Sequence, residues 1–314
     1  MLNTFSILLP VFGLIAAGFF SRKTRIMGQA AASELNRFVV WLALPALLFD
    51  IMANSHWSTL FKPNFISVFL ISTGLIFVIT LLWRTKQGQA LADASIESVA
   101  ASYSNTGYVG FPLLLLAFGE SSQVPTTIAT IIVVCVLFAI AITLIETGLK
   151  ADVPLGRRIK HVLLAVFRNP LVLAPIAGVV FAMTPFNLPE GVETFLKLLA
   201  NAASPCALVS LGLFLADANK SSSPHDNGLQ TVAWALTAAK LIAQPLIVAG
   251  LAIYVFDMDW ELTMMAVMLA ALPTGTGPFM LAELYQRNAV ITAQTVLFST
   301  ICSLFSLTLI LQFI

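Results

Sequence analysis

Charged residues are scarce in this sequence, and their scarcity excludes a water-soluble globular protein. Only 10% of the 314 residues are charged and 59% are hydrophobic, whereas soluble proteins carry about 25% charged residues. A soluble globule of this size would lack the polar surface needed to cover its apolar atoms. The mean hydropathy of +0.93 therefore indicates a chain that lies in a lipid bilayer. The net charge of +1 gives no reason to expect a nucleic acid or an acidic protein as partner.

Cysteine and histidine are also scarce, with three of each, so there is little material for metal or nucleophilic chemistry. The cysteines stand far apart in apolar runs, without CxxC spacing, and are interpreted as small packing residues: Cys135, Cys206 and Cys302. The histidines all fall in expected loops: His56, His161 and His225. Because neither a metal cluster nor a Ser/His/Asp arrangement is visible, we predict no metal, no cofactor and no enzymatic activity.

Long apolar runs dominate what is present. A membrane helix needs about 20 mostly apolar residues, and charge clusters separate ten such runs. The predicted transmembrane helices, numbered 1 to 10, cover residues 2–20, 38–54, 65–83, 94–118, 126–148, 169–185, 194–216, 230–256, 262–284 and 289–313. The first run has no charged segment before it and no A-x-A-like cleavage site after it, so it is interpreted as a retained helix rather than a signal peptide.

The basic residues predict how the chain is oriented in the membrane. The loops after helices 1, 3, 5, 7 and 9 carry 13 of the 16 Lys and Arg residues. Because cytoplasmic loops are enriched in Lys and Arg, these loops are predicted to be cytoplasmic, with both chain ends outside. All connections are short, which leaves no room for a soluble catalytic domain.

Proline and glycine recur at a constant offset of 160 residues in the two halves of the chain. The residues concerned are Pro10, Gly18 and Pro45, which recur as Pro170, Gly178 and Pro205. We predict an all-α integral membrane fold of two five-helix repeats, 1–148 and 169–314, joined by a cytoplasmic linker at 149–168. Since five is odd, the two repeats would have inverted topology. Both residue types are common in membrane helices, so coincidence is the alternative.

Helices 4 and 9 are predicted to be broken near the middle of the membrane, within 104–112 and 273–278. Each run combines glycines and prolines that disfavour a continuous helix: Gly107, Gly110 and Pro112 in the first, and Pro273, Gly275, Gly277 and Pro278 in the second. Backbone groups freed in this way must be buried in protein or line a wet cavity. Two breaks at corresponding places in inverted halves indicate the binding site of a transporter; ordinary helix kinks are the alternative.

A broken helix suits an anionic solute. The N-terminal end of each half-helix presents unpaired N–H groups and partial positive charge at mid-depth, where they can hold a carboxylate. Asn105 begins the second half of helix 4 and could either grip a carboxylate or cap the half-helix. Asn201 and Ser204, which flank Pro205 in helix 7, are interpreted as packing groups.

Lys240 lies near the middle of helix 8, where a lysine is expensive and is therefore expected to face the protein interior. Three roles stay open: a fixed cation that supports the two broken helices, an attractor for an anion, or a proton carrier. A purely structural lysine paired to a carbonyl or carboxylate is the alternative. Asp93 and Glu97 begin helix 4 and are interpreted as complementing the helix dipole, with a cytoplasmic gate as the alternative. The lack of a mid-depth acidic pair on helices 4, 5 or 9 argues against a sodium/proton antiporter.

The motifs around both breaks resemble those of the auxin efflux carrier family. Residues 105–113 (NTGYVGFPL) resemble the family's fourth-helix signature, 272–285 (LPTGTGPFMLAELY) its ninth-helix signature, and 42–49 (LALPALLF) the second helix of bacterial members. The likeness covers the whole chain, without the long central hydrophilic loop that plant members often have.

This resemblance implies a fold shared with bile-acid/sodium symporters and sodium/proton antiporters. Helices 1, 2, 6 and 7 would form a scaffold, also the surface of a homodimer, and helices 3, 4, 5, 8, 9 and 10 a moving transport domain. Pro112 and Pro278 would mark the crossover, and Asn105 would contact the substrate. Lys240 would stand where sodium binds in the symporters. Bacterial members are linked to malonate and malate, plant members to indole-3-acetate.

The sequence therefore predicts an elevator-type carrier of a small organic anion in a bacterial inner membrane. The predicted substrate-binding residues are Asn105, Thr106, Gly107, Lys240, Thr274 and Gly275, and the predicted crossover residues are Gly110, Pro112, Pro273, Gly277 and Pro278. A sodium-coupled symporter is the first alternative. A membrane-embedded enzyme and a ligand sensor are the others; the first lacks a visible nucleophile–base pair and the second an attached signalling domain.

Overall fold

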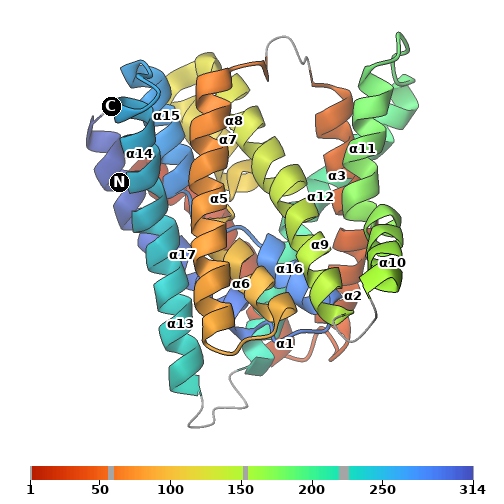
Figure 1. Cartoon of the computed structure of the whole chain (residues 1–314). Coiled ribbons are helices and arrows are strands. Elements are labelled where there is room, and N and C mark those ends of the chain that lie inside the picture. Colours follow the sequence, from red (N-terminus) through yellow and green to blue (C-terminus); the bar gives the residue numbers. More distant parts are fainter. Residues whose placement is uncertain (1, 56–59, 151–154, 219–225, 314) are drawn as a thin grey trace.

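The computed structural model describes residues 2–55, 60–150, 155–218 and 226–313, and these residues form helices and short connections (Figure 1). Within them the only extended pairing is an isolated antiparallel bridge between Ser104 and Thr274. Six helical stretches in this part of the chain are long and apolar enough to cross a membrane. The chain is therefore a multi-pass membrane protein, as predicted, whereas the count of ten spans stays a prediction.

Helix covers most of each predicted span, and spans 94–118 and 262–284 are interrupted by short non-helical segments. In chain order the α-helices are α1 (Leu2–Lys23), α2 (Ala31–Phe38), α3 (Leu44–Ala53), α5 (Pro63–Lys86), α6 (Leu91–Ser102), α7 (Phe111–Phe118), α8 (Gln123–Thr130), α9 (Leu137–Leu149), α10 (Leu155–Arg168), α11 (Pro170–Ala182), α12 (Glu190–Ala218), α13 (Asp226–Ala238), α14 (Gln244–Tyr254), α15 (Trp260–Ala271), α16 (Gly277–Leu284) and α17 (Val290–Ile310). The main difference from the prediction is α10, which occupies most of the predicted linker. His161, expected in a loop, lies on α10; His56 and His225 lie outside the described residues.

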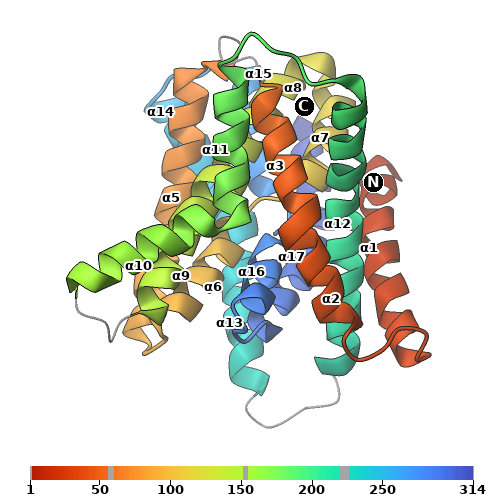
Figure 2. The ribbon, with the colours of Figure 1, turned by 90° about the vertical axis from the view of Figure 1, so that its right-hand side faces the viewer.

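The helix α10 forms because its sequence is amphipathic. Leu155, Ile159, Val162 and Val166 recur every three or four residues, which is the spacing of one helical face. Figure 2 shows α10 running across the direction of the long helices. Val162 is buried, whereas Ile159 is exposed. Residues 149–168 were predicted to be a linker because they are hydrophilic, although part of this segment has the apolar spacing of an amphipathic helix.

Wide helical turns precede three of the prolines. The π-helical segments η1 (Val39–Ala43), η2 (Thr106–Gly110) and η5 (Ala239–Ala243) are followed by α3, α7 and α14, and each of these α-helices has proline as its second residue. Proline has no N–H to donate and its ring crowds the preceding turn. A locally widened turn is one way for a helix to continue through such a position.

The helices pack in two groups. In Figure 2, α11, α3, α12 and α1 stand in a row, and each packs extensively against the next. The second group is built around α5, α6, α9, α13, α14, α15 and α17, with its most extensive contacts between α5 and α6, α6 and α9, α14 and α15, and α13 and α17. The outward side of α5 is apolar and exposed at Leu70, Ile71, Leu75, Val78, Ile79 and Leu82, as expected of a surface that faces lipid.

Two glycines make equivalent close contacts within the first group. A Cβ atom at Gly18 of α1 would lie 2.2 Å from the carbonyl oxygen of Val209 in α12. A Cβ atom at Gly178 of α11 would lie 2.7 Å from the carbonyl oxygen of Phe49 in α3. Both glycines therefore let two helix backbones approach closely. The offset of 160 residues relates Gly18 to Gly178 and also Phe49 to Val209.

Candidate functional site

The two helix breaks meet inside the molecule. The chain leaves α6 at Ser102 and α15 at Ala271, and the two unwound segments that follow pair side by side. The backbone N–H of Asn105 donates to the Pro273 carbonyl oxygen at 2.9 Å, and the N–H of Gly275 donates to the Tyr103 carbonyl oxygen at 3.3 Å. We call these two segments, 103–105 and 272–276, the crossing. Their pairing satisfies backbone groups that would otherwise be orphaned in the membrane.

Buried side chains hold the crossing in place. Thr274 is fully buried; its N–H donates to the Ser299 hydroxyl at 3.0 Å and its own hydroxyl donates to the Ala100 carbonyl oxygen at 2.9 Å. The ring of Tyr103 stacks on Phe138 and leaves no room for a side chain at Gly275, where a Cβ atom would lie 2.6 Å from that ring. The glycine of this motif is thus required by packing at the crossing.

The backbone carbonyls at the ends of both half-helices have partners on the segment 239–244. The Lys240 side-chain nitrogen, fully buried, donates to the Ala270 carbonyl oxygen in the last turn of α15. The Gln244 amide donates to the Ser102 carbonyl oxygen at the end of α6 at 3.4 Å, and to the Thr73 hydroxyl at 3.2 Å. C-terminal carbonyls of helices lack intrahelical partners and carry partial negative charge. Lys240 and Gln244 therefore support the two half-helices from behind.

The N-terminal ends of the opposite half-helices have no side-chain cap. Asn105 precedes η2, which continues into α7, and Thr276 precedes α16; neither side chain forms a capping hydrogen bond. Both residues line the same cavity. Helix N-termini without a side-chain cap present N–H groups and partial positive charge to whatever occupies the space in front of them.

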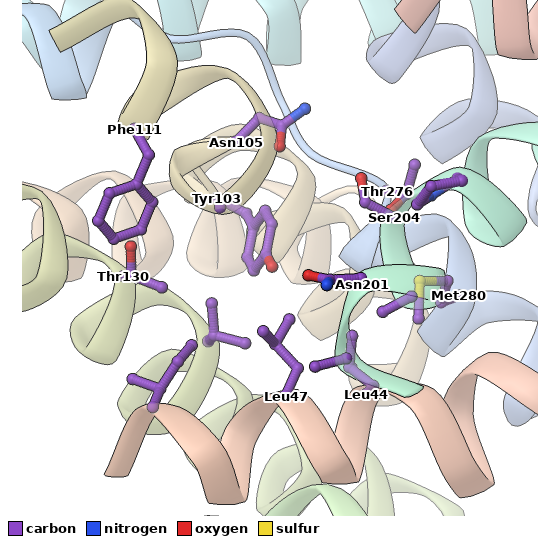
Figure 3. A pocket seen from close by; sticks show the side chains of 16 residues that line it. Leu44, Leu47, Tyr103, Asn105, Phe111, Thr130, Asn201, Ser204, Thr276 and Met280 are labelled. Atoms are coloured by element: carbon purple, nitrogen blue, oxygen red, sulfur yellow. The ribbon is translucent and has the colours of Figure 1, made fainter. Parts of the chain in front are cut away.

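This cavity lies between the two helix groups and has a volume of about 390 Å³. Figure 3 shows the polar side chains of Tyr103, Asn105, Asn201, Ser204 and Thr276 around it, with Leu44 and Leu47 of α3 on its opposite side. None of its lining residues carries a charge at neutral pH: Leu44, Leu47, Ile51, Tyr103, Asn105, Gly107, Phe111, Thr130, Val134, Ala200, Asn201, Ala203, Ser204, Pro205, Thr276 and Met280. A mostly apolar pocket with a few convergent polar groups is typical of a small-molecule site.

The cavity extends toward the face of the molecule on which α3 ends, which we call the Asn54 face. A second cavity of about 330 Å³, lined by Asp50 and Asn54, shares Ile51, Phe111 and Thr130 with the first. On the opposite side the Asn36 amide of α2 donates to the Met280 carbonyl oxygen of α16 at 3.3 Å, and Met280 lines the first cavity. Asn36 also lines a third cavity of about 440 Å³.

The predicted binding residues fall into two sets. Asn105 and Gly107 line the cavity, whereas Thr106, Thr274, Gly275 and Lys240 do not. Thr106, Thr274 and Lys240 are buried behind the cavity wall. Of the predicted crossover residues, Pro273 accepts a hydrogen bond at the crossing, Gly110 and Pro112 lie at the junction of η2 and α7, and Gly277 and Pro278 begin α16.

Sequence reasoning missed several lining residues. Tyr103 lies just before the predicted motif, and Thr276 lies inside the second motif without having been selected. Asn201 and Ser204, interpreted as packing groups, line the cavity from α12. The position of Asn201 four residues before Pro205 was an available signal, because proline removes the N–H that would bond the carbonyl four residues earlier.

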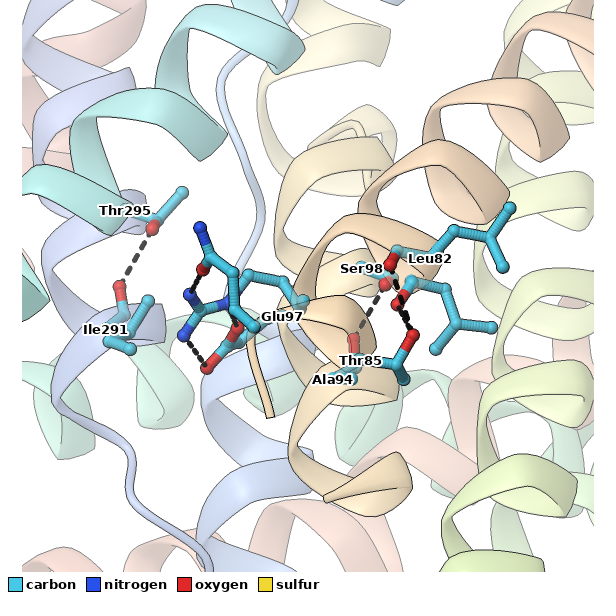
Figure 4. A network of polar contacts seen from close by, with 10 residues as sticks. Leu82, Thr85, Ala94, Glu97, Ser98, Ile291 and Thr295 are labelled. Atoms are coloured by element: carbon cyan, nitrogen blue, oxygen red, sulfur yellow. Dashed lines mark hydrogen bonds and ion pairs between the residues drawn. The ribbon is translucent and has the colours of Figure 1, made fainter. Parts of the chain in front are cut away.

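Asp93 and Glu97 both form ion pairs in the N-terminal part of α6. Glu97 pairs with Arg84 of α5, and both side chains are buried (Figure 4). Asp93 accepts from Arg287, with Arg287 Nε and Asp93 Oδ1 2.7 Å apart. The hydrogen bond from Arg287 to Asp93 raises the pKa of this guanidinium above its ordinary value. These pairs join α5, α6 and the segment before α17, so they hold the second helix group together.

A lipid-embedded helical fold with a solute-sized cavity at two crossing helix breaks defines a membrane transport protein. The comparison with known families agrees: the family model described as "Membrane transport protein" matches residues 4–311, and the chain belongs to this family, which includes the auxin efflux carriers. The chain is therefore a membrane transporter and not an enzyme.

Named relatives align over almost the full length of the chain. It is 31% identical to the "Putative malonate transporter" of Rhizobium meliloti, over 98% of this chain and 95% of the relative. It is 28% identical to an "Uncharacterized transporter" of Methanothermobacter thermautotrophicus, over 96% and 95% of the two chains. It is 22% identical to "Auxin efflux carrier component 8" of Arabidopsis thaliana, over 94% and 93%.

Proposed function

We propose that this transporter carries a small organic anion, a carboxylate, and binds it in the cavity at the crossing. The observation that carries the proposal is the pair of uncapped helix N-termini, behind Asn105 and Thr276, that open onto a cavity lined by no charged residue. Such a site favours an anion through N–H groups and helix dipoles and has no acidic group to repel it. The names of two relatives, "Putative malonate transporter" and "Auxin efflux carrier component 8", support the same class of solute.

We further propose ten membrane spans in two inverted five-helix repeats, with the Asn54 face outside a bacterial inner membrane. The matched contacts of Gly18 with Val209 and of Gly178 with Phe49 support the repeat, because one offset relates both partners. The excess of Lys and Arg in alternate loops supports the orientation. A homodimer through the group of α1, α3, α11 and α12 belongs to the same proposal.

Transport is proposed to follow an elevator mechanism, in which the second helix group moves against the first. The cavity lies between the two groups and shares three lining residues with a second cavity at the Asn54 face, while the Asn36–Met280 contact lies on the other side. Movement that breaks this contact would join the cavity to the third one, which Asn36 and Glu283 line. This arrangement is what alternating access requires.

Thermal stability of the detergent-purified protein tests the proposal. The midpoint of unfolding is measured with malonate, malate, indole-3-acetate and a bile acid, each with and without sodium. We expect one acid to raise the midpoint by several degrees without sodium, and Asn105→Ala to remove the shift. A shift that requires sodium would support the sodium-coupled symporter instead; the buried Lys240, already bonded to Ala270, argues against sodium in that region. No shift with any acid would contradict the proposed solute class.

A further inference from the structure

One wall of the cavity presents a polar group that neither helix break supplies. Asn201 and Ser204 line the cavity from α12, which packs with α1 and α3 in the first helix group. Figure 3 shows the Asn201 amide and the Tyr103 hydroxyl projecting into the space between α12 and the crossing. In the described part of the chain, the Asn201 side chain has no hydrogen-bond partner. Its two N–H donors are therefore available to a solute.

The local backbone explains why this position is polar. Pro205 lies inside α12 and has no N–H to donate to the carbonyl of the residue four positions earlier, which is Asn201. The cavity wall at Asn201 consequently combines an unpaired amide with a backbone carbonyl that lacks its usual partner. The Asn201 side chain is exposed toward the cavity, where water or a bound molecule can satisfy it.

We propose that Asn201 is a specificity-determining residue that donates a hydrogen bond from its amide to the carboxylate of the bound anion. This inference rests on the proposed function. The half-helix N-termini behind Asn105 and Thr276 would hold the carboxylate from one side, and Asn201 would reach it from the other. A carboxylate accepts about four hydrogen bonds, so both sides can be used at once. The contact joins the two helix groups through the solute, so movement of one group against the other breaks it.

Equilibrium binding of the acid that stabilises the wild type tests the proposal, with Asn201→Ala and the near-isosteric Asn201→Asp as variants. A hydrogen bond to a charged group is worth about tenfold or more in affinity, so Asn201→Ala is expected to raise Kd about tenfold. Asn201→Asp is expected to raise Kd further at neutral pH, because it replaces a donor by an anion, and to recover part of the loss at a pH low enough to protonate the introduced carboxyl. Leu198→Ala, on α12 and exposed away from the cavity, is the matched control and should bind like the wild type.

A packing role for Asn201 predicts the reverse order, with the isosteric variant milder than the alanine variant and no recovery at low pH. That order, or wild-type affinity in both variants, would overturn the inference. The proposed function would stand if Asn105→Ala still loses binding. A wild type that binds no acid overturns the proposed function, and this inference falls with it.

Discussion

The side-chain nitrogen of Lys240 donates a hydrogen bond to the carbonyl oxygen of Ala270, in the last turn of the half-helix α15. The lysine is fully buried and forms no ion pair with a carboxylate of the described residues. A hydrogen-bond donor at a helix C-terminus is favourable because the last carbonyls are unpaired and partly negative. Of the roles considered from the sequence, this geometry matches a fixed support for the broken helix and equally the structural alternative, a lysine paired to a carbonyl.

Replacing Lys240 by methionine is therefore expected to act mainly on the stability of the protein, and less on its direct contacts with the solute. The variant keeps the aliphatic volume but leaves the Ala270 carbonyl without its partner, at a cost of about 1–3 kcal/mol. Denaturant or thermal unfolding of the purified variant measures this loss. A variant with wild-type stability that binds no acid would instead show that Lys240 attracts the anion directly.

Two glycines of the helix breaks are expected to respond differently to alanine. Gly275→Ala places a Cβ atom 2.6 Å from the Tyr103 ring, whereas the space around Gly107, which lines the cavity, is empty within 4 Å. We expect Gly275→Ala to lower the unfolding midpoint and Gly107→Ala to leave it nearly unchanged while reducing cavity volume and solute affinity. Parallel measurements of unfolding and of solute binding separate the two effects. Equal loss of stability in both variants would contradict this geometry.

The paired glycine contacts of the first helix group give a third prediction. Gly18→Ala and Gly178→Ala each force a Cβ atom against a carbonyl oxygen of the neighbouring helix and should destabilise by roughly 1–3 kcal/mol, the usual cost of overpacking. Gly13→Ala, in the same helix as Gly18 but with nothing within 4 Å, should be neutral or stabilising by up to about 1 kcal/mol. If Gly13→Ala proved as damaging as Gly18→Ala, close packing of α1 on α12 would not be the reason for the glycine.

The two ion pairs in the N-terminal part of α6 are expected to differ in strength. Arg84 and Glu97 are 5% and 7% exposed, whereas Arg287 and Asp93 are 32% and 19% exposed. Removing one partner of a buried pair leaves an uncompensated charge and costs about 3–5 kcal/mol, while a partly exposed pair contributes about 1 kcal/mol or less. Glu97→Ala should therefore lower stability more than Asp93→Ala. A double-mutant cycle for each pair measures the difference, and a stronger coupling between Arg287 and Asp93 would reverse the ranking.

The sequence was sufficient to predict the helix breaks, because glycine and proline act locally. Proline has no N–H to donate, so Pro112 and Pro278 disfavour a continuous helix but are tolerated at the start of a half-helix. The pairing of the breaks with each other was expected only through the inverted repeat and the family resemblance. It depends on contacts between residues about 170 positions apart, such as Asn105 with Pro273.

The cavity lining could be predicted only in part. Asn105 and Gly107 were found because they lie inside a motif, but Asn201 faces the cavity through the rotation of α12, which tertiary packing sets. Thr274 and Gly275 belong to the same kind of motif and yet support the crossing from within. The sequence motifs thus predicted the region of the cavity. The structure was needed to distinguish the residues that line the cavity from the buried residues that support the crossing.

Uptake of the stabilising acid into proteoliposomes tests the central claim most directly, with wild type and Asn105→Ala reconstituted at equal density. We predict saturable uptake by the wild type and at least a tenfold loss of uptake in Asn105→Ala. Asn105 lines the cavity and precedes an uncapped half-helix. Loss of a hydrogen bond from its amide to a carboxylate weakens binding by about 1.4 kcal/mol or more. Equal saturable uptake by both proteins would show that the solute passes elsewhere and would contradict the assignment of the cavity at the crossing.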